Sequence, residues 1–143
     1  KSSDLLIDLI PKPKWKHLKS GKEHEAKKTL TPDLISVSNG KLSIYDAKYY
    51  KIQLNEDGVS RQPGVGDVTK QYLYELAYKK LAEANDLIID KNAFIMPSDS
   101  SEDKSIGIAS IDLFSSYGDE TTFNDIEIIL KPCEQMFEKY LNN

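Results

Sequence analysis

The sequence predicts an α/β or α+β sandwich in which helices flank a mixed β-sheet. Two alternating apolar runs flank Asn39-Gly40, which indicates a β-hairpin, and a helical pattern follows over residues 67–84. Short segments rich in β-branched and aromatic residues come after the helix. These later candidate strands cover residues 92–96, 106–114 and 125–130. A hairpin followed by a helix and further strands is typical of a mixed sheet covered by helices.

The first thirty residues are expected to hold one short helix and an irregular segment. Ser3 can cap a helix over residues 4–10, which Pro11 and Pro13 would end. Residues 11–30 are rich in lysine and lack a regular apolar pattern. No helix or strand is therefore predicted there.

A tight hairpin is predicted over residues 31–50, TPDLISVSNGKLSIYDAKYY. Asn-Gly favours a two-residue type I′ turn, because both central residues of that turn take a positive φ. The turn fixes how the two strands pair. If Ser38 pairs with Lys41, then counting back along both strands places Asp33 directly opposite Asp46.

One face of this hairpin carries apolar and charged residues together. Side chains alternate along a strand, so Asp33, Asp46 and Lys48 share a face with the apolar residues next to the turn. Those apolar residues are Ile35, Val37, Leu42 and Ile44. Two aspartates with Cβ atoms roughly 5 Å apart repel each other without a compensating cation. A divalent metal ion is the natural candidate.

The segment after the hairpin is predicted to form a loop and then a helix. Residues 51–66, KIQLNEDGVSRQPGVG, contain the glycines and proline of a loop, and Asp67 can cap a helix that continues to about Ala84. Apolar side chains recur at helical spacing, and this stripe is expected to pack on the sheet. The stripe consists of Leu73, Leu76, Ala77, Leu81 and Ala84, while Gln71, Tyr74, Glu75 and Tyr78 lie to the other side.

The last third of the chain is expected to complete the sheet and end in a helix. A polar run over residues 97–105 separates the two strands 92–96 and 106–114. The third strand, 125–130, leads through Pro132 into the final helix, since proline is favoured in a first helical turn.

Length and composition bound the class of protein. With 143 residues, of which 39% are hydrophobic, the chain can form one domain with a core. No apolar run approaches the length of a membrane span and no signal segment is present, so a cytoplasmic location without a membrane partner is expected. The lone Cys133 excludes a disulfide framework. A first residue of Lys indicates that the single domain 1–143 is a fragment of a longer chain.

The formal net charge of -4 argues against a uniformly basic nucleic-acid coat, but the charge is unevenly spread. Residues 11–28 carry seven lysines against Glu23 and Glu25, while residues 99–143 hold ten acidic residues and three lysines. The basic segment leads directly toward Asp33. It would attract phosphate to that end of the hairpin, or it is simply a solvated loop.

The charged end of the hairpin has the donor atoms of a magnesium site. Mg²⁺ prefers carboxylate and carbonyl oxygens, which Asp33, Asp46 and the backbone carbonyl of Ala47 would supply. Lys48 points to the same side, where it would orient or deprotonate an attacking water and neutralise charge on a phosphorane. A metal, an activated water and a nearby cation are what metal-assisted hydrolysis of a phosphodiester needs.

The motif PD at residues 32–33 followed by DAK at residues 46–48 resembles the signature of the PD-(D/E)xK nuclease superfamily. The longer stretch over residues 31–80 is similar to restriction endonucleases of the LlaJI type, and more distantly to McrC-type nuclease domains. Residues 92–131 are compatible with the later strands of that family. The resemblance implies a restriction-endonuclease-like core.

The resemblance also implies an activity: an Mg²⁺-dependent DNA endonuclease, the cleavage domain of a type II restriction enzyme. It would act on double-stranded DNA, as a homodimer or with a partner subunit of a restriction system. Asp33 and Asp46 would be metal ligands and Lys48 the catalytic lysine. Related nucleases carry Gln-x-x-x-Tyr on the following helix, whereas here Gln71 is followed at that spacing by Glu75. Gln71, which would orient the water or the lysine, therefore departs from the pattern.

Two other functions fit the same motif. One is a catalytically silent scaffold of this fold that binds DNA or protein, and the other is a repair or recombination nuclease. An intact Asp33, Asp46 and Lys48 favours an enzyme, because a silent relative has no need to keep two facing carboxylates.

Several other residues have both a functional and a structural interpretation. The glycines of residues 64–66 could hold a phosphate on their N–H groups or merely form the turn into the helix. The tyrosines could stack on bases or pack in the core. His17 and His24 lack the partners of a zinc site, and Cys133 is expected to pack. The candidates for a further acidic residue before the hairpin, which is common in the superfamily, are Asp4, Asp8, Glu23 and Glu25.

Overall fold

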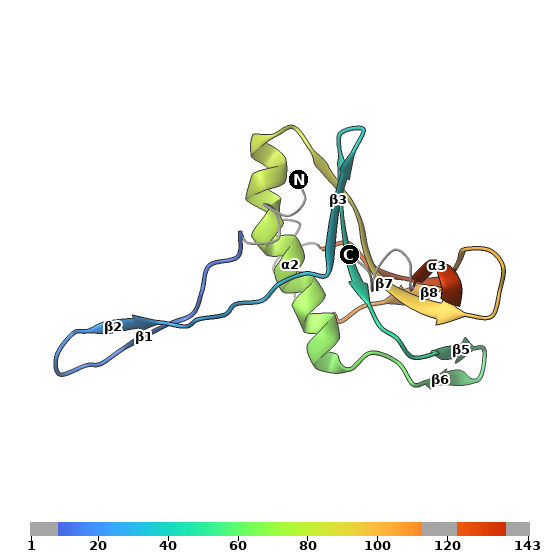
Figure 1. Cartoon of the computed structure of the whole chain (residues 1–143), viewed down its shortest axis with the longest axis horizontal. Helices are drawn as coiled ribbons and strands as arrows, with labels where there is room; N and C mark the ends of the chain where they lie inside the picture. Colours follow the sequence, from blue (N-terminus) through green and yellow to red (C-terminus); the bar gives the residue numbers. More distant parts are fainter. Residues whose placement is uncertain (1–8, 113–122, 137–143) are drawn as a thin grey trace.

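The structure, a computed structural model, describes residues 9–112 and 123–136 (Figure 1). Its centre is a five-stranded mixed sheet with strand order β3-β4-β7-β9-β8. The strands are β3 (Leu34–Ser38), β4 (Lys41–Ala47), β7 (Ile88–Ser98), β8 (Lys104–Ala109) and β9 (Ile126–Pro132). The inner strands β4, β7 and β9 run parallel, whereas β3 and β8 pair antiparallel at the two edges. The α+β fold expected from the sequence is confirmed.

The predicted hairpin and its register are confirmed. Ser38 pairs with Lys41 and Ile35 with Ile44, and the turn residues Asn39 and Gly40 have φ values of 53° and 76°. Ile35 and Ile44 are buried, whereas Val37, next to the turn, is 46% exposed.

Helix α2 (Val65–Ala84) connects β4 to the parallel strand β7 and covers one face of the sheet (Figure 1). The expected leucine stripe does not form its buried face. Leu73 is 45% exposed and Leu76 is 55% exposed, while Tyr78 is 1% exposed. The helix side chains that are buried are Gln71, Tyr72, Tyr74, Glu75, Tyr78 and Ala82. The prediction of the packing face was therefore wrong, although Leu81 of the predicted stripe does pack against the core.

The reason for this orientation is a polar group at the centre of the sheet. Asn92 on β7 is 1% exposed, so its amide needs partners from the helix above it. It donates to the carbonyl of Gln71 at 2.9 Å and accepts from Gln71 Nε2 at 2.6 Å. Glu75 accepts from the Asn124 N–H at 3.0 Å. Turning the leucines inward would leave these buried groups unpaired, at about 1 to 3 kcal/mol each.

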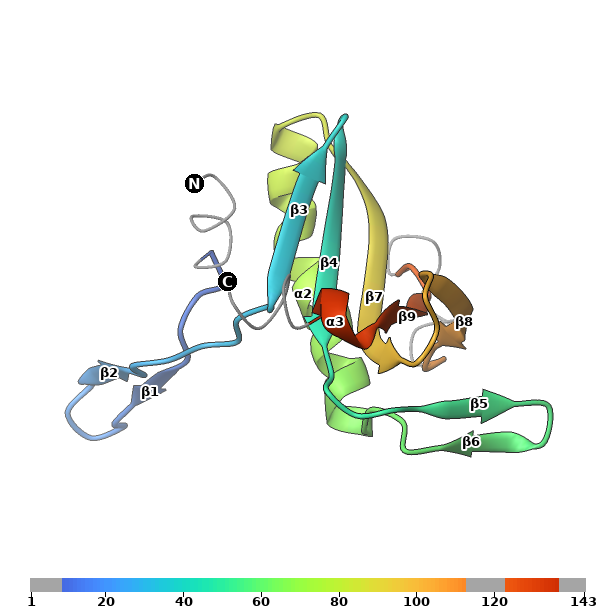
Figure 2. The same ribbon diagram turned by 45° about the vertical axis from the view of Figure 1, so that its right-hand side comes forward.

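Two segments expected to be irregular form antiparallel ribbons instead. In residues 11–30, β1 (Lys14–Lys16) pairs with β2 (Glu23–Glu25), and in the loop after the hairpin β5 (Gln53–Asn55) pairs with β6 (Gly58–Ser60). The β1–β2 ribbon projects away from the sheet, whereas the β5–β6 ribbon lies on the other side of the molecule near β8 (Figures 1 and 2), where Leu54 approaches Gly107. Their side chains are exposed, so neither has the apolar alternation by which a strand is recognised in a sequence.

The opposite face of the sheet is covered by the short helix α3 (Cys133–Met136), which follows β9 directly. Met136 packs with Ala47, Ala93, Ile95 and Ile129 in a buried cluster on this face. Pro132 is the last residue of β9 rather than part of the helix. The expected helix over residues 4–10 falls almost entirely outside the described residues, as does the continuation of the final helix.

Substitutions on the two faces of α2 give a direct check of its orientation. Tyr74 is 4% exposed and its hydroxyl donates to the Thr31 carbonyl at 3.3 Å. We expect Tyr74→Phe to lower the free energy of unfolding by about 1 kcal/mol, while Leu73→Ala on the outer face changes it by less than about 0.5 kcal/mol. Urea denaturation measures both. A larger loss for Leu73→Ala would contradict this packing.

Candidate active site

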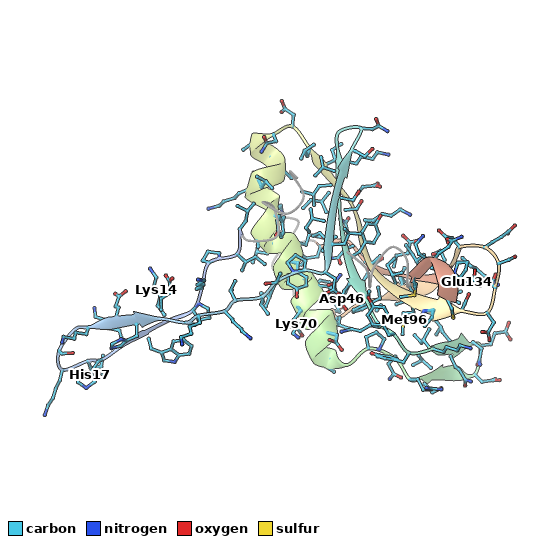
Figure 3. All side chains as sticks on the ribbon, viewed as in Figure 1. Lys14, His17, Asp46, Lys70, Met96 and Glu134 are labelled. Atoms are coloured by element: carbon cyan, nitrogen blue, oxygen red, sulfur yellow. The ribbon has the colours of Figure 1, made fainter. Side chains whose placement is uncertain are left out.

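The charged residues of the hairpin meet where β4 ends and α2 begins. Asp46 is the second-to-last residue of β4, and Lys48 follows the strand directly. The Lys48 N–H donates to the Ile95 carbonyl at 2.9 Å, which extends the pairing of β4 with β7 by one step. Strand alternation therefore still applies at Lys48, and its side chain lies on the same face as Asp46. Figure 3 shows Asp46 beside α2.

Asp33 lies just before β3, opposite Asp46, and is held by the backbone of the neighbouring strand. Its Oδ2 atom accepts a hydrogen bond from the Ala47 N–H at 2.8 Å. Because the N–H of Lys48 points toward β7, the alternation of the strand turns the N–H of Ala47 toward β3, where Asp33 is placed. The hairpin thus fixes one carboxylate oxygen, and Asp33 remains exposed to solvent.

The carboxylate of Asp46 is largely buried, with 15% of its side chain exposed. Burial raises the pKa of Asp46 to about 6; Lys48 acts in the opposite direction, and the nearby charge of Asp33 raises the pKa further. Its Oδ2 atom lies 3.0 Å from Lys48 Nζ but has no well-aligned hydrogen bond. The negative charge of Asp46 is therefore only partly balanced by Lys48, and its Oδ2 atom can still accept a bond from a cation.

The ammonium group of Lys48 provides positive charge next to the facing aspartates Asp33 and Asp46. Its Nζ atom lies 2.9 Å from Asp67 Oδ1 and 3.0 Å from Asp46 Oδ2. Burial alone would lower the pKa of Lys48, but the contacts with Asp67 and Asp46 outweigh it and raise the pKa above its ordinary value. Lys48 is thus an ammonium ion at neutral pH. Repulsion between Asp33 and Asp46 does not by itself demand a metal ion.

Asp67 belongs to this cluster and was missed as a site residue from the sequence. One of its oxygens accepts from Lys48 Nζ, and the other accepts from the Gly64 N–H at 3.0 Å, which caps the start of α2. The hydrogen bond from Lys48 lowers the pKa of Asp67, and burial opposes this shift only in part. The sequence indicated the capping role alone, because the contact with Lys48 joins residues 19 apart.

Gln71 lies one helical turn beyond Asp67, but its hydrogen bonds lead away from Lys48. Its Nε2 atom donates to Asn92 Oδ1 at 2.6 Å and more weakly to the Ala93 carbonyl at 3.4 Å. Its Oε1 atom is buried and has no hydrogen-bond partner among the residues that the structure describes. The structure thus places Gln71 between the helix and β7, and its role in orienting water stays a prediction.

The remaining candidates lie apart from this cluster. Glu23 is an exposed residue of β2, as are His24 and Glu25, and His17 bonds Ser20 Oγ through Nδ1 at 3.0 Å. Asp4 and Asp8 fall outside the described residues. Gly64 is the N-cap residue before α2, as in the structural interpretation of these glycines, and Cys133 donates to the Ser98 carbonyl at 3.2 Å.

The donor atoms fit a hard divalent cation. Asp33 and Asp46 present carboxylate oxygens at one end of the sheet, and the buried Oδ2 of Asp46 is without an aligned donor. Within residues 9–112 and 123–136, no group of three or more His, Cys, Asp or Glu side chains could hold a metal ion. Two carboxylates, a backbone carbonyl and substrate or water oxygens would complete an Mg²⁺ site, because this ion keeps several waters.

Comparison with known proteins shows the family of the chain. The family model of the LlaJI restriction endonuclease matches residues 4–130, which include the whole hairpin, α2 and most of β9. The chain belongs to the LlaJI restriction endonuclease family. The family match thus covers Asp33, Asp46, Lys48 and Asp67 together. No solved structure matches the chain.

A curated relative of this LlaJI family member is the type II restriction enzyme BsuMI component YdjA of Bacillus subtilis (strain 168). It is 32% identical over 141 residues, which make up 96% of this chain and 29% of the relative. The chain thus spans less than a third of the relative's length. In the part of the chain that the structure describes, no helix is long and apolar enough to cross a membrane.

Asp67 gives a prediction about the position of Lys48. We expect Asp67→Asn to keep most of the cap on α2 but to release Lys48 toward Asp46. If the full-length protein cleaves DNA, the cleavage rate should then fall by about tenfold, less than the factor of about 10² to 10³ for complete removal of an electrostatic group, with a stability change below about 1 kcal/mol. Activity on plasmid DNA and thermal unfolding are the measurements. Asp57→Asn, on the exposed turn between β5 and β6, is the matched control, and equal activity of both variants would contradict the assignment.

Proposed function

We propose that this chain is the cleavage domain of a type II restriction enzyme and hydrolyses phosphodiester bonds of double-stranded DNA with Mg²⁺. The observation that carries the proposal is the cluster of Asp33, Asp46 and Lys48 at one end of β4, built by the hairpin and closed by α2. Membership of a restriction endonuclease family and the name of the B. subtilis relative support it.

Asp33 and Asp46 would hold the metal ion, with the Ala47 carbonyl as a third oxygen. The bound ion would supply Lewis acidity toward the phosphate and favour ionisation of a water molecule. Asp46 is suited to this because burial has already raised the free energy of its charged form, which a cation would stabilise. Asp33 is oriented by the Ala47 N–H, so its free oxygen is directed without further ordering.

Lys48 would act as a cation rather than as a base. Its contacts with Asp67 and Asp46 keep its proton in place, so it cannot accept one from water at neutral pH. A fixed ammonium near the scissile phosphate would stabilise the negative charge that develops as water attacks phosphorus. The attacking water would release its proton to solvent, and the leaving oxygen would take one from solvent. The sequence left open whether Lys48 orients or deprotonates the attacking water in addition to neutralising charge on the phosphorane, and this role keeps the last of these.

Cleavage of plasmid DNA by the full-length protein tests the proposal. Supercoiled plasmid should be converted to linear fragments with defined ends when Mg²⁺ is present, and should stay intact with EDTA or with Ca²⁺ in place of Mg²⁺. A protein that binds DNA without cutting any of a varied set of plasmids would instead be a silent scaffold. Cutting only at branched or damaged duplexes would favour a repair nuclease.

A further inference from the structure

We propose that the β1–β2 ribbon, residues 12–28, is an arm that binds the backbone of the DNA duplex beside the cleavage site. The inference deepens the proposed function and rests on DNA being the substrate. Figures 1 and 2 show the ribbon projecting from the body, and Figure 3 places Lys14 and His17 along it, away from α2.

The ribbon is ordered by its backbone rather than by a core. The His17 N–H donates to the Lys22 carbonyl and the Ala26 N–H donates to the Pro13 carbonyl, both at 2.8 Å. At its base, Thr29 Oγ1 donates to the Pro11 carbonyl at 2.7 Å and links the two legs. All six side chains of β1 and β2 are exposed. A two-stranded ribbon without a packed core is marginally stable by itself, so contact with another surface would stabilise it.

The charge of the ribbon is placed at its two ends. On one face Lys14 pairs with Glu25 and Lys16 with Glu23, and these opposite charges cancel. The remaining lysines have no acidic residue opposite them in the ribbon. They are Lys19 and Lys22 at the tip, and Lys12, Lys27 and Lys28 at the base. Positive charge at separate points along a slender element is complementary to the regularly spaced phosphates of a duplex.

Trp15 identifies the face that meets the DNA. It lies opposite His24 on the face without the Lys–Glu pairs, and it is 62% exposed. At the tip, Leu18 is 92% exposed. Large apolar side chains on a ribbon with no core are kept in water at a free-energy cost. An exposed indole that is flat and partly polar is suited to contact with the sugars that lie between the phosphates of a duplex.

The segment between the arm and Asp33 limits how far from the cleavage site the arm can contact the duplex. Asp33 follows Ala26 by seven positions, and Leu30 on this segment packs against the core cluster that contains Ile35. A fully extended segment of that length spans at most about 25 Å. At about 3.4 Å per base pair, the base of the arm would contact phosphates within about seven base pairs of the cut.

Trp15 is the only tryptophan among these 143 residues, so its fluorescence reports on the surroundings of the arm. The experiment titrates the full-length protein with a duplex in EDTA, so no cleavage is needed. The signal is the tryptophan emission of the parent minus that of Trp15→Phe, and anisotropy of a labelled duplex measures total binding in parallel. We expect Trp15 emission to change in step with binding, and the change to be reversed by salt.

Charge variants complete the test. Lys19→Gln with Lys22→Gln should reduce the slope of log affinity against log salt by about 2, close to one for each phosphate that the arm no longer neutralises. The matched control is Lys41→Gln with Lys80→Gln, two exposed lysines outside the arm, and it should keep the parental slope.

Three outcomes would overturn the proposal. Two of them are an unchanged Trp15 emission while the duplex binds, and an unchanged salt slope in the tip variant. The third is an equal emission change with poly-glutamate at the same charge concentration, which would assign the arm to acidic surfaces in general. Because the measurement excludes cleavage, a protein that fails to cut plasmid but shows the expected titration would contradict the nuclease proposal and leave the arm intact.

Discussion

Lys48→Ala should abolish most DNA cleavage while leaving metal binding in place. We expect the cleavage rate to fall by a factor on the order of 10² to 10³, as for the loss of one preorganised group that stabilises transition-state charge. The affinity for Mg²⁺ should be kept or increased, since the ammonium 3.0 Å from Asp46 Oδ2 competes for that oxygen. Plasmid cleavage rates and calorimetric titration with Mg²⁺ are the two measurements.

The matched control is Lys51→Ala, three residues further along the chain. Lys51 is exposed and bonds Asp99 at 2.8 Å, outside the cluster, so its removal should change cleavage by less than about twofold. Lys48→Arg should not restore activity, because a planar guanidinium is too large for the position between Asp46 and Asp67. If Lys48→Ala cut at the parental rate, the charged end of the hairpin would have a structural role only.

Asp46→Asn should lose metal binding and cleavage together. An amide keeps the shape of the side chain but removes the charge that a divalent cation requires. We expect the Mg²⁺ affinity to fall by at least about 10² and the cleavage rate by about 10³ or more, because the bound ion contributes several kcal/mol to such hydrolysis. Asp99→Asn, at a carboxylate that is 84% exposed, should behave like the parent.

The same substitution should make the metal-free protein more stable at neutral pH. The pKa of Asp46 is raised from 3.8 to about 6, so folding favours its protonated form. The resulting stability is fully present below pH 3.8 and is lost as the pH rises through 6. Asparagine avoids this loss, and we expect a gain on the order of 1 to 2 kcal/mol at pH 7, because the raised pKa of Asp46 already includes the opposing contact with Lys48. The gain should vanish at about pH 4, and urea denaturation at both pH values in EDTA measures it. A variant less stable than the parent at pH 7 would mean that the ion pair outweighs burial.

The local part of the site could be predicted from the sequence. Asn39-Gly40 permits one tight turn, and a tight turn fixes the pairing of every residue on both strands. Strand alternation then places Asp46 and Lys48 on one face, which their 3.0 Å contact confirms. These rules act between near neighbours in the chain, so they need no knowledge of the rest of the fold.

The buried face of α2 could not be chosen in this way, because several faces of the helix are partly apolar. Leucine is the more hydrophobic residue by itself, but Asn92 at the centre of the sheet selects the face that carries Gln71 and Glu75. The two ribbons were missed for a related reason. Their pairing depends on backbone hydrogen bonds alone, which leave no pattern in exposed side chains.

The order of residues along the chain was thus enough to predict the hairpin, its register and the three charged residues at its end. The face of α2 that meets them, and with it the contact that joins Lys48 to Asp67, depended on how the whole domain packs. The difference lies in the range of each interaction. Backbone geometry passes from residue to residue along a strand, whereas the rotation of a helix is set by the surface on which it packs. That rotation brings Asp67 to Lys48 and holds the lysine in its charged form.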